Sequence, residues 1–328
     1  MRKQHITIAL GQMVLDNVIH DFQDFPQTKV QKSLLLGGPP SFAGIVGLIL
    51  SKIYTWLPPP LVYAYACPKA ITLIKNIPDY SLILTNIKLH SNCPHFQLEY
   101  SNEKQGRTLF LENSPIQFNP YNFNWKFGES LPTTIIGSVY HEFTNPEIFT
   151  FLRDKCSYIA FDAQGCFRQR TQEGKIVFRD WWDLRIIENI DCLKISETEA
   201  KFMNLGAHPY EIISKVLETN VSSVLFTRGK HGSILGTKNR NRGEIQLYEV
   251  PTFTEGTIVD ETGAGDVFLY SYVIHFQSFN DELNAVAFAT SVTSLFIEQN
   301  RFQAEFSEKK IQFRQRKIKA NITEFLRL

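Results

Sequence analysis

The chain has 328 residues, of which 43% are hydrophobic and 20% are charged. This length and composition allow a large buried core, which excludes an intrinsically disordered protein and a disulfide-stapled miniprotein. The 34 basic and 33 acidic residues leave a formal net charge of +1, so no overall positive field predicts binding to nucleic acid or to an anionic membrane.

The cysteine pattern and the apolar segments bear on the compartment. The five cysteines are Cys67, Cys93, Cys156, Cys166 and Cys192. An odd count without a CxxC pair predicts reduced thiols and no zinc site. The first residues lack the apolar core of a signal peptide, and the most apolar stretch, 42–50, is shorter than the roughly 20 residues of a membrane span. We therefore expect a cytoplasmic protein with no membrane partner.

Short β-rich runs alternate with helical patterns along the chain. The predicted strands span residues 5–10, 61–66, 81–85, 133–137, 158–161, 192–195 and 222–226, and the predicted helices span residues 41–54, 145–154, 209–219 and 267–276. Strands that alternate with helices indicate an α/β fold with a mostly parallel sheet covered on both faces. No linker or composition break divides the chain, so residues 1–328 are expected to form a single domain.

Two segments interrupt this alternation, at 30–36 and 95–111. Both have strand-like residues around polar turns and no intervening helix, which indicates antiparallel strands. One interpretation is a small β lid built from roughly 14–36 and 93–115. The alternative is a pair of edge hairpins without a role in ligand binding.

A basic run lies near the C-terminus, at 309–319. Its six lysines and arginines are compatible with contacts to phosphates or nucleic acid. Because the overall charge is close to zero, a solvated helix face is the favoured interpretation, and no nucleic-acid partner is expected.

The most informative segment is Gly263-Ala264-Gly265-Asp266, at the start of the helical run 267–276. Small residues at a helix N-terminus let a substrate approach the backbone, and the first N–H groups favour a negatively charged group. Asp266 is placed to take a proton from a hydroxyl beside these N–H groups, as phosphoryl transfer to an alcohol requires. A helix start with an acidic first turn is the structural alternative.

Other catalytic and nucleotide-binding motifs are missing. The sequence has no G-x-x-x-x-G-K-[ST] loop, and Phe268 stands where a dinucleotide fingerprint needs glycine. It also has no H-E-x-x-H and no G-x-S-x-G. A P-loop nucleotidase, a Rossmann dehydrogenase, a zinc protease and an α/β-hydrolase are therefore not expected.

The segment from Asp260 to Asp266 resembles the D-T-x-G-A-G-D signature of the ribokinase/PfkB carbohydrate kinase family, with Glu261 as its departure. The resemblance implies that Asp260 and Thr262 serve the donor side. It also implies that Asp16, otherwise a turn residue, binds substrate hydroxyls. Gly37 and Gly38 resemble the family's Gly-Gly substrate loop, although the asparagine that usually follows is missing.

Three further segments resemble family motifs. Ser196 and Glu199 resemble the N-x-x-E element, in which the glutamate helps to organise Mg²⁺; a capping box is the structural alternative. The T-x-G-x-x-G nucleotide loop corresponds to Thr227, Gly229 and Gly232. Asp162-Ala163-Gln164-Gly165-Cys166-Phe167-Arg168 resembles the D-x-Q-G-x-x-R form of the inositol-kinase-like branch. Gln164 and Arg168 would then contact the acceptor, and a surface salt bridge is the alternative for Arg168.

The resemblance implies a ribokinase-like three-layer α/β fold, with a central mostly parallel sheet and a small β lid. It implies ATP and Mg²⁺ as cofactors and a sugar or cyclic polyol, with myo-inositol as the leading candidate, as acceptor. A nucleoside or other sugar kinase of the same family is the alternative. From another class, a catalytically silent ligand-binding regulator with this fold remains open. A homodimer through the lid edge is also compatible with the sequence.

Overall fold

The main body is a ten-stranded sheet in the order β16-β15-β14-β13-β12-β9-β8-β1-β4-β5. A computed structural model describes residues 6–20, 31–77, 79–84, 86–100, 107–127, 130–239 and 242–327. The strands of this sheet are β1 (Thr7–Gln12), β4 (Leu61–Ala66), β5 (Asn86–Leu89), β8 (Thr133–Gly137), β9 (Tyr158–Asp162), β12 (Cys192–Ser196), β13 (Ser223–Thr227), β14 (Ser233–Lys238), β15 (Ile245–Val250) and β16 (Thr323–Arg327). The neighbouring strands from β5 through β4, β1, β8, β9 and β12 to β13 pair in parallel. The strands from β13 through β14 and β15 to β16 pair antiparallel.

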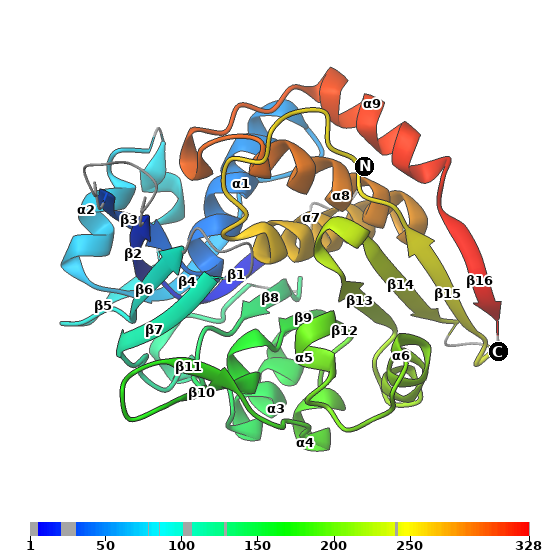
Figure 1. Ribbon diagram of the computed structural model, residues 1–328, viewed down its shortest axis with the longest axis horizontal. Coiled ribbons are helices and arrows are strands. Elements are labelled where there is room, and N and C mark those ends of the chain that lie inside the picture. Colours follow the sequence, from blue (N-terminus) through cyan, green and yellow to red (C-terminus); the bar gives the residue numbers. More distant parts are fainter. Residues whose placement is uncertain are drawn as a thin grey trace, which may run out of the picture.

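Helices cover both faces of this sheet, so the body has three layers (Figure 1). On one face lie α1 (Pro39–Ile53), α7 (Ala264–Phe279), α8 (Glu282–Ile297) and α9 (Glu308–Lys319), and on the other α3 (Pro146–Lys155), α4 (Leu184–Ile187), α5 (Glu197–Ala200) and α6 (Pro209–Leu217). Two large clusters of buried apolar side chains fill the two interfaces between sheet and helices. The predicted α/β fold with a mostly parallel sheet is confirmed.

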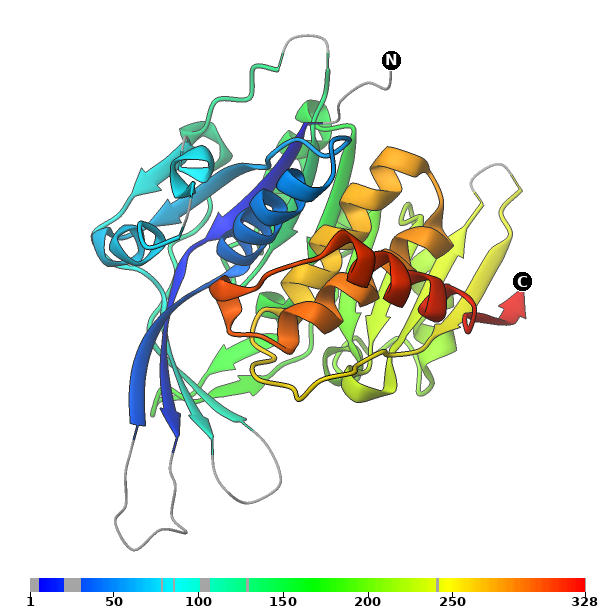
Figure 2. The ribbon, with the colours of Figure 1, turned by 90° about the horizontal axis from the view of Figure 1, so that it is seen from above.

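A second sheet, called here the lid sheet, projects from the side of this body (Figure 2). Its strands are β2 (Val14–His20), β3 (Gln31–Gly37), β6 (His95–Tyr100) and β7 (Arg107–Asn113), in the order β3-β2-β6-β7. The pairs β2–β3 and β6–β7 are antiparallel, as expected. The two hairpins, however, join through a parallel pairing of β2 with β6. The polar turn at 101–106 lies outside the described residues.

The remaining elements are short. They are α2 (Pro68–Ile74), the strand pair β10 (Arg168–Arg170) and β11 (Ile176–Phe178), and the 3₁₀ turns η1 (Tyr80–Ile83), η2 (Pro120–Asn122), η3 (Gln164–Phe167), η4 (Gly229–His231) and η5 (Arg301–Gln303). The strand predicted at 81–85 is wrong, because that segment contains η1 and the edge strand begins at Asn86. Tyr80 and Leu84 pack on the core from this turn, and a short apolar run does not distinguish such a turn from a strand.

The expectation of five reduced thiols is also wrong. Cys67, at the end of β4, and Cys93, shortly before β6, form a disulfide with a Cα–Cα distance of 5.2 Å. Cys156, Cys166 and Cys192 are buried free thiols. The two partners are 26 positions apart, and only the fold brings them together. The cysteines therefore no longer support the expectation of a reducing compartment.

The basic run at 309–319 forms most of α9. Ile311, Arg314 and Ile318 share its buried face. Arg314 is the exception to the predicted solvated face, because its guanidinium pairs with Glu298 at 2.8 Å and with Glu255 at 3.3 Å. Among the described residues, no helix combines the length and apolar character that crossing a membrane requires.

Candidate active site

A cavity of about 1190 Å³ opens where the carboxyl ends of the parallel strands meet the lid sheet. This edge is where open α/β sheets bind ligands. Most of the residues predicted from the motifs line it, namely Asp16, Gly38, Gln164, Arg168, Ser196, Glu199, Thr227, Gly229, Asp260, Thr262, Gly263, Ala264, Gly265 and Asp266. The fold therefore gathers segments from both ends of the chain into one site.

Gly37 and Gly232 do not line the cavity, and each has a structural reason to be glycine. A Cβ on Gly37 would lie 2.4 Å from the Asp16 carboxylate. Gly232 has φ +81°, and a Cβ there would lie 2.2 Å from the carbonyl oxygen of Val250. These glycines shape the walls of the site, and direct contact with a ligand is not supported.

The N-terminus of α7 forms the floor of the cavity. Gly263 is its N-cap with φ +84° and ψ 0°, a left-handed conformation that favours glycine. The Ala264 N–H already bonds to the Glu261 carbonyl oxygen at 3.1 Å. Gly265 and Asp266 lie in the first turn, where N–H groups have no acceptor within the helix. The Ala264 N–H is therefore already engaged, whereas the N–H groups of Gly265 and Asp266 are candidates for binding an anion.

Asp266 is half-buried and lies beside the charged pair of Lys194 and Asp162. Lys194 of β12 donates from Nζ to Oδ2 of Asp162 at 2.8 Å, and both side chains are about 95% buried. Lys194 Nζ also lies 2.8 Å from the position that a Cβ on Gly265 would occupy. Burial and the Asp162 charge raise the pKa of Asp266 to about 8, while Lys194 opposes that rise. A carboxyl with this pKa can exchange a proton near neutral pH.

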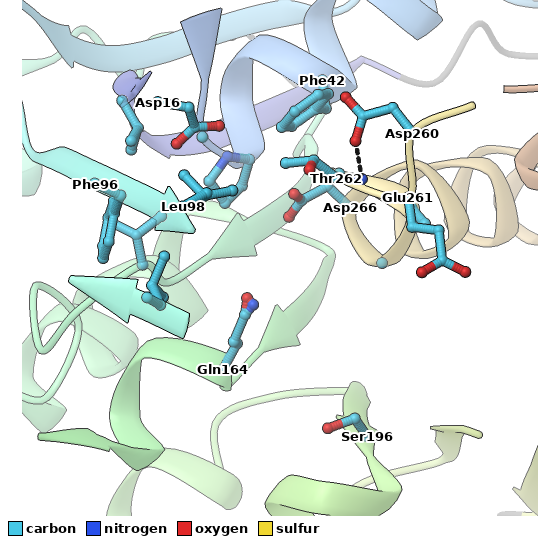
Figure 3. A pocket seen from close by; sticks show the side chains of 18 of the residues that line it. Asp16, Phe42, Phe96, Leu98, Gln164, Ser196, Asp260, Glu261, Thr262 and Asp266 are labelled. Atoms are coloured by element: carbon cyan, nitrogen blue, oxygen red, sulfur yellow. Dashed lines mark hydrogen bonds between the residues drawn. The ribbon is translucent and has the colours of Figure 1, made fainter. Parts of the chain in front are cut away.

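Two further carboxylates are joined through one arginine. Arg301 of η5 donates from Nη1 to Asp16 Oδ2 at 2.8 Å and from Nε to Asp260 Oδ2 at 2.6 Å. The other oxygen of Asp260 accepts from the Thr262 N–H at 2.8 Å (Figure 3). Burial alone would raise the pKa of Asp260, but the Arg301 guanidinium lowers it below its usual range. Asp260 therefore acts as a charged group.

The opposite wall carries Gln164, Arg168 and the start of α5. Figure 3 shows the Gln164 side chain directed toward the cavity, across from Asp266. Arg168 donates to the Val139 carbonyl oxygen at 2.9 Å, and its guanidinium lies 5.5 Å from the centroid of the Phe96 ring in β6. It is therefore a half-buried residue of the cavity wall. The exposed Glu261 side chain points away from Asp16.

The capping box predicted at the start of α5 is present. Ser196 Oγ accepts from the Glu199 N–H at 3.3 Å, and Glu199 Oε2 accepts from the Ser196 N–H at 2.7 Å. Glu199 also lines the cavity, as does Glu197. Mg²⁺ is usually held by one or two carboxylates together with substrate phosphates, which fits this pair. The described residues hold no cluster of three or more His, Cys, Asp or Glu side chains that would bind a metal alone.

The cavity also fits a nucleotide phosphate chain. The Thr262 hydroxyl oxygen is buried and has no hydrogen-bond partner among the described residues, which leaves a donor for a phosphoryl oxygen. Lys194, Arg228 and Arg301 line the cavity as cations. The volume exceeds that of most pockets for one small molecule and has room for a donor together with an acceptor.

Motif analysis missed Lys194, Arg301 and the role of Asp162. A lysine within the otherwise apolar strand 192–195 was a usable signal for Lys194, because parallel strands are normally apolar on both faces. Asp162 directly follows the predicted strand 158–161, which was also a signal. Arg301 carries no such signal, because it lies 41 positions beyond Asp260 and 285 beyond Asp16.

Comparisons with known proteins agree with this fold and with the family resemblance. The model of the pfkB family of carbohydrate kinases matches residues 167–309. A ribokinase from Staphylococcus aureus is 29% identical over 125 residues, which are 36% of this chain and 39% of that protein. A probable chloroplastic fructokinase-6 from Arabidopsis thaliana is 34% identical over 88 residues, 26% of this chain and 21% of that protein. The matched stretches thus span well under half of each curated relative.

Solved structures match over nearly the whole chain. A ribokinase from Thermotoga maritima has a TM-score of 0.70 at 17% identity, covering 95% of this chain and 99% of that one. A pyrophosphate-dependent kinase of the ribokinase family, solved with a pyrophosphate analogue and myo-inositol, has a TM-score of 0.73 at 18% identity, covering 94% and 100%. The protein thus has the ribokinase-like fold. The predicted resemblance to the ribokinase/PfkB family is confirmed, and the family model places its sequence match at 167–309.

Proposed function

We propose that this protein transfers the γ-phosphoryl group of Mg·ATP to a hydroxyl of a sugar or cyclic polyol. The observation that carries the proposal is the position of Asp266, a half-buried carboxyl in the first turn of α7 that lines the cavity. The substrate-side residues Asp16 and Gly38 and the donor-side residues Ser196 and Thr227 line the same cavity as Asp266. An acceptor and a donor can therefore meet at the same carboxyl.

Each group of the chain has a defined task in this reaction. Bound Mg·ATP would supply the phosphoryl group, and its Mg²⁺ would offset part of the negative charge of the phosphates. Asp266 accepts the proton of the attacking hydroxyl through its carboxylate. The N–H groups of Gly265 and Asp266 stabilise negative charge that develops on the transferring group. Lys194, held by Asp162, adds a fixed positive charge beside Gly265.

Myo-inositol is the acceptor to test first. Gln164 and Arg168 of the D-x-Q-G-x-x-R segment line the same cavity as Asp16, and Figure 3 shows Gln164 and Asp16 on different sides of it. Such an arrangement suits a ring with hydroxyls around its whole edge. A structural neighbour was solved with myo-inositol, which adds support for this class of acceptor.

The test is a coupled ADP-release assay with Mg·ATP against inositols, hexoses, pentoses, sugar acids and nucleosides. A phosphate-release arm uses pyrophosphate as donor, because one structural neighbour is pyrophosphate-dependent. Asp266→Asn is the control and should lose turnover by at least 1000-fold while it still binds ATP. Near-wild-type turnover in that variant would refute the assignment of the base.

The panel also separates the alternatives. Turnover on a nucleoside or another sugar would support the proposed mechanism with a different acceptor. Turnover with pyrophosphate and not with ATP would show that pyrophosphate is the donor. No turnover on any acceptor, with ATP still bound, would identify a silent ligand-binding regulator and contradict the kinase proposal.

A further inference from the structure

Arg301 is a deeply buried cation of the cavity wall that the family motifs do not include. Its side chain is about 95% buried and still lines the cavity. Beyond the two carboxylates already described, its Nη1 donates to the Leu36 carbonyl oxygen at 3.2 Å. Leu36 directly precedes the Gly37-Gly38 turn. One guanidinium therefore contacts β2, the end of β3 and the loop before α7.

These contacts connect the two halves of the proposed reaction. Asp16 and the Gly37-Gly38 turn belong to the acceptor side, whereas Asp260 begins the segment that becomes the anion site of α7. Asp260 holds the Thr262 N–H, which precedes Gly263 by one residue. Within the described residues, the contacts of Arg301 give a direct polar route from the acceptor carboxylate to this segment.

We propose that Arg301 is a positioning residue that couples acceptor binding to donor binding in this site. The inference rests on the proposed function, since it assumes that both ligands occupy the cavity. A guanidinium is planar and presents its N–H groups in a rigid fork, so a change in the position of one bound carboxylate is transmitted to the other. An acceptor that orders Asp16 therefore also orders Asp260 and the residues that follow it.

The packing beside Arg301 limits how it can move. Phe302, the next residue, stacks on Phe42 with ring centroids 5.3 Å apart. Phe42 in turn packs at the start of α7, because a Cβ on Gly263 would lie 2.5 Å from its ring. The packed rings of Phe302 and Phe42 hold the backbone beside Arg301 in place. A shift of Asp16 is therefore expected to move the guanidinium and Asp260 together.

Coupling of this kind is reciprocal and can be measured without turnover. Isothermal titration gives the Kd of Mg·ADP with and without saturating myo-inositol, or with the acceptor that the assay panel identifies. The wild-type protein should bind Mg·ADP about 5-fold or more tightly with acceptor present, and the acceptor should gain the same factor from Mg·ADP. Arg301→Met should bring both ratios close to 1.

Two variants control for a merely structural role. Arg301→Lys keeps the charge but supplies no fork, so its ratio should also fall toward 1. Arg153→Met removes another arginine that pairs with a buried carboxylate, Asp191 at 2.9 Å, at the opposite end of the sheet. That variant should keep the wild-type ratio. If Arg301→Met does not fold, the lysine variant decides.

The outcomes separate this inference from the proposed function. A wild-type ratio of 1, or a full ratio in the folded Arg301 variants, overturns the coupling while turnover still supports the kinase. If no acceptor in the panel binds or reacts, the proposed function fails and the coupling fails with it.

Discussion

The charge of Asp266 is set by the buried pair beside it. Burial and Asp162 raise the pKa of Asp266 to about 8, and Lys194 lowers it. The base is protonated below that pKa, so turnover should fall on the acid side. Asp162→Asn should move the acid limb of kcat/KM to lower pH, and Lys194→Met should move it to higher pH. A shift of both variants in the same direction would contradict this arrangement.

The same carboxyl should affect stability. Between the ordinary aspartate pKa of 3.8 and about 8, folded Asp266 keeps its proton while the unfolded group loses it. The contribution of this group to stability therefore falls as pH rises through that window. Asp266→Asn cannot ionise, so its stability relative to wild type should grow from about pH 4 to about pH 8 and then level off. Denaturant titrations at pH 5, 7 and 9 test this, and a constant difference would count against a raised pKa.

For single residues, the sequence indicates which side chains can take part in the chemistry better than it indicates where they lie in the fold. The residues of the signature can be predicted because they are contiguous and a helix start fixes their relation. Arg301 and Lys194 become part of the site through packing between distant segments. Only a three-dimensional arrangement shows that Lys194 faces Gly265, or that one arginine contacts both Asp16 and Asp260.

The start of α7 depends on Gly263, where the structure leaves almost no space for a side chain. Gly263 combines a φ of +84° with a Cβ position 2.5 Å from the Phe42 ring. Gly263→Ala should destabilise the protein by about 1 kcal/mol or more from the backbone alone, with a further 1–3 kcal/mol from the clash. It should also weaken ATP binding, because the Gly265 and Asp266 N–H groups that we propose to hold the phosphates follow directly in the chain.

Gly243 supplies a matched control for that variant. It has φ +72°, and a Cβ there would meet no atom within 4 Å. Gly243→Ala should show the backbone cost without the clash and leave ATP binding intact. Denaturant unfolding of both variants gives the difference, and equal losses would show that Phe42 yields to the new methyl group.

At the scale of the whole molecule, prediction succeeded where elements are local. Strands β4 and β8 have the predicted bounds because each is an apolar run between clear breaks. The order of strands in a sheet depends on contacts between distant segments. The parallel pairing of β2 with β6, which joins two hairpins into the lid sheet, has no signal in either strand alone.

The Cys67–Cys93 disulfide ties the lid sheet to the body. Cys67 directly follows β4 of the main sheet, and Cys93 lies shortly before β6, so the bond closes a loop with a sequence separation of 26. Closure of a loop of this size restricts the unfolded chain and should stabilise the protein by about 3 kcal/mol. Unfolding in denaturant with and without a reductant measures that difference. A Cys67→Ser/Cys93→Ser variant should match the reduced wild type and ignore the reductant. Before reduction, a thiol reagent should detect three thiols in the unfolded wild type, since Cys156, Cys166 and Cys192 are free. Detection of five thiols would contradict the disulfide.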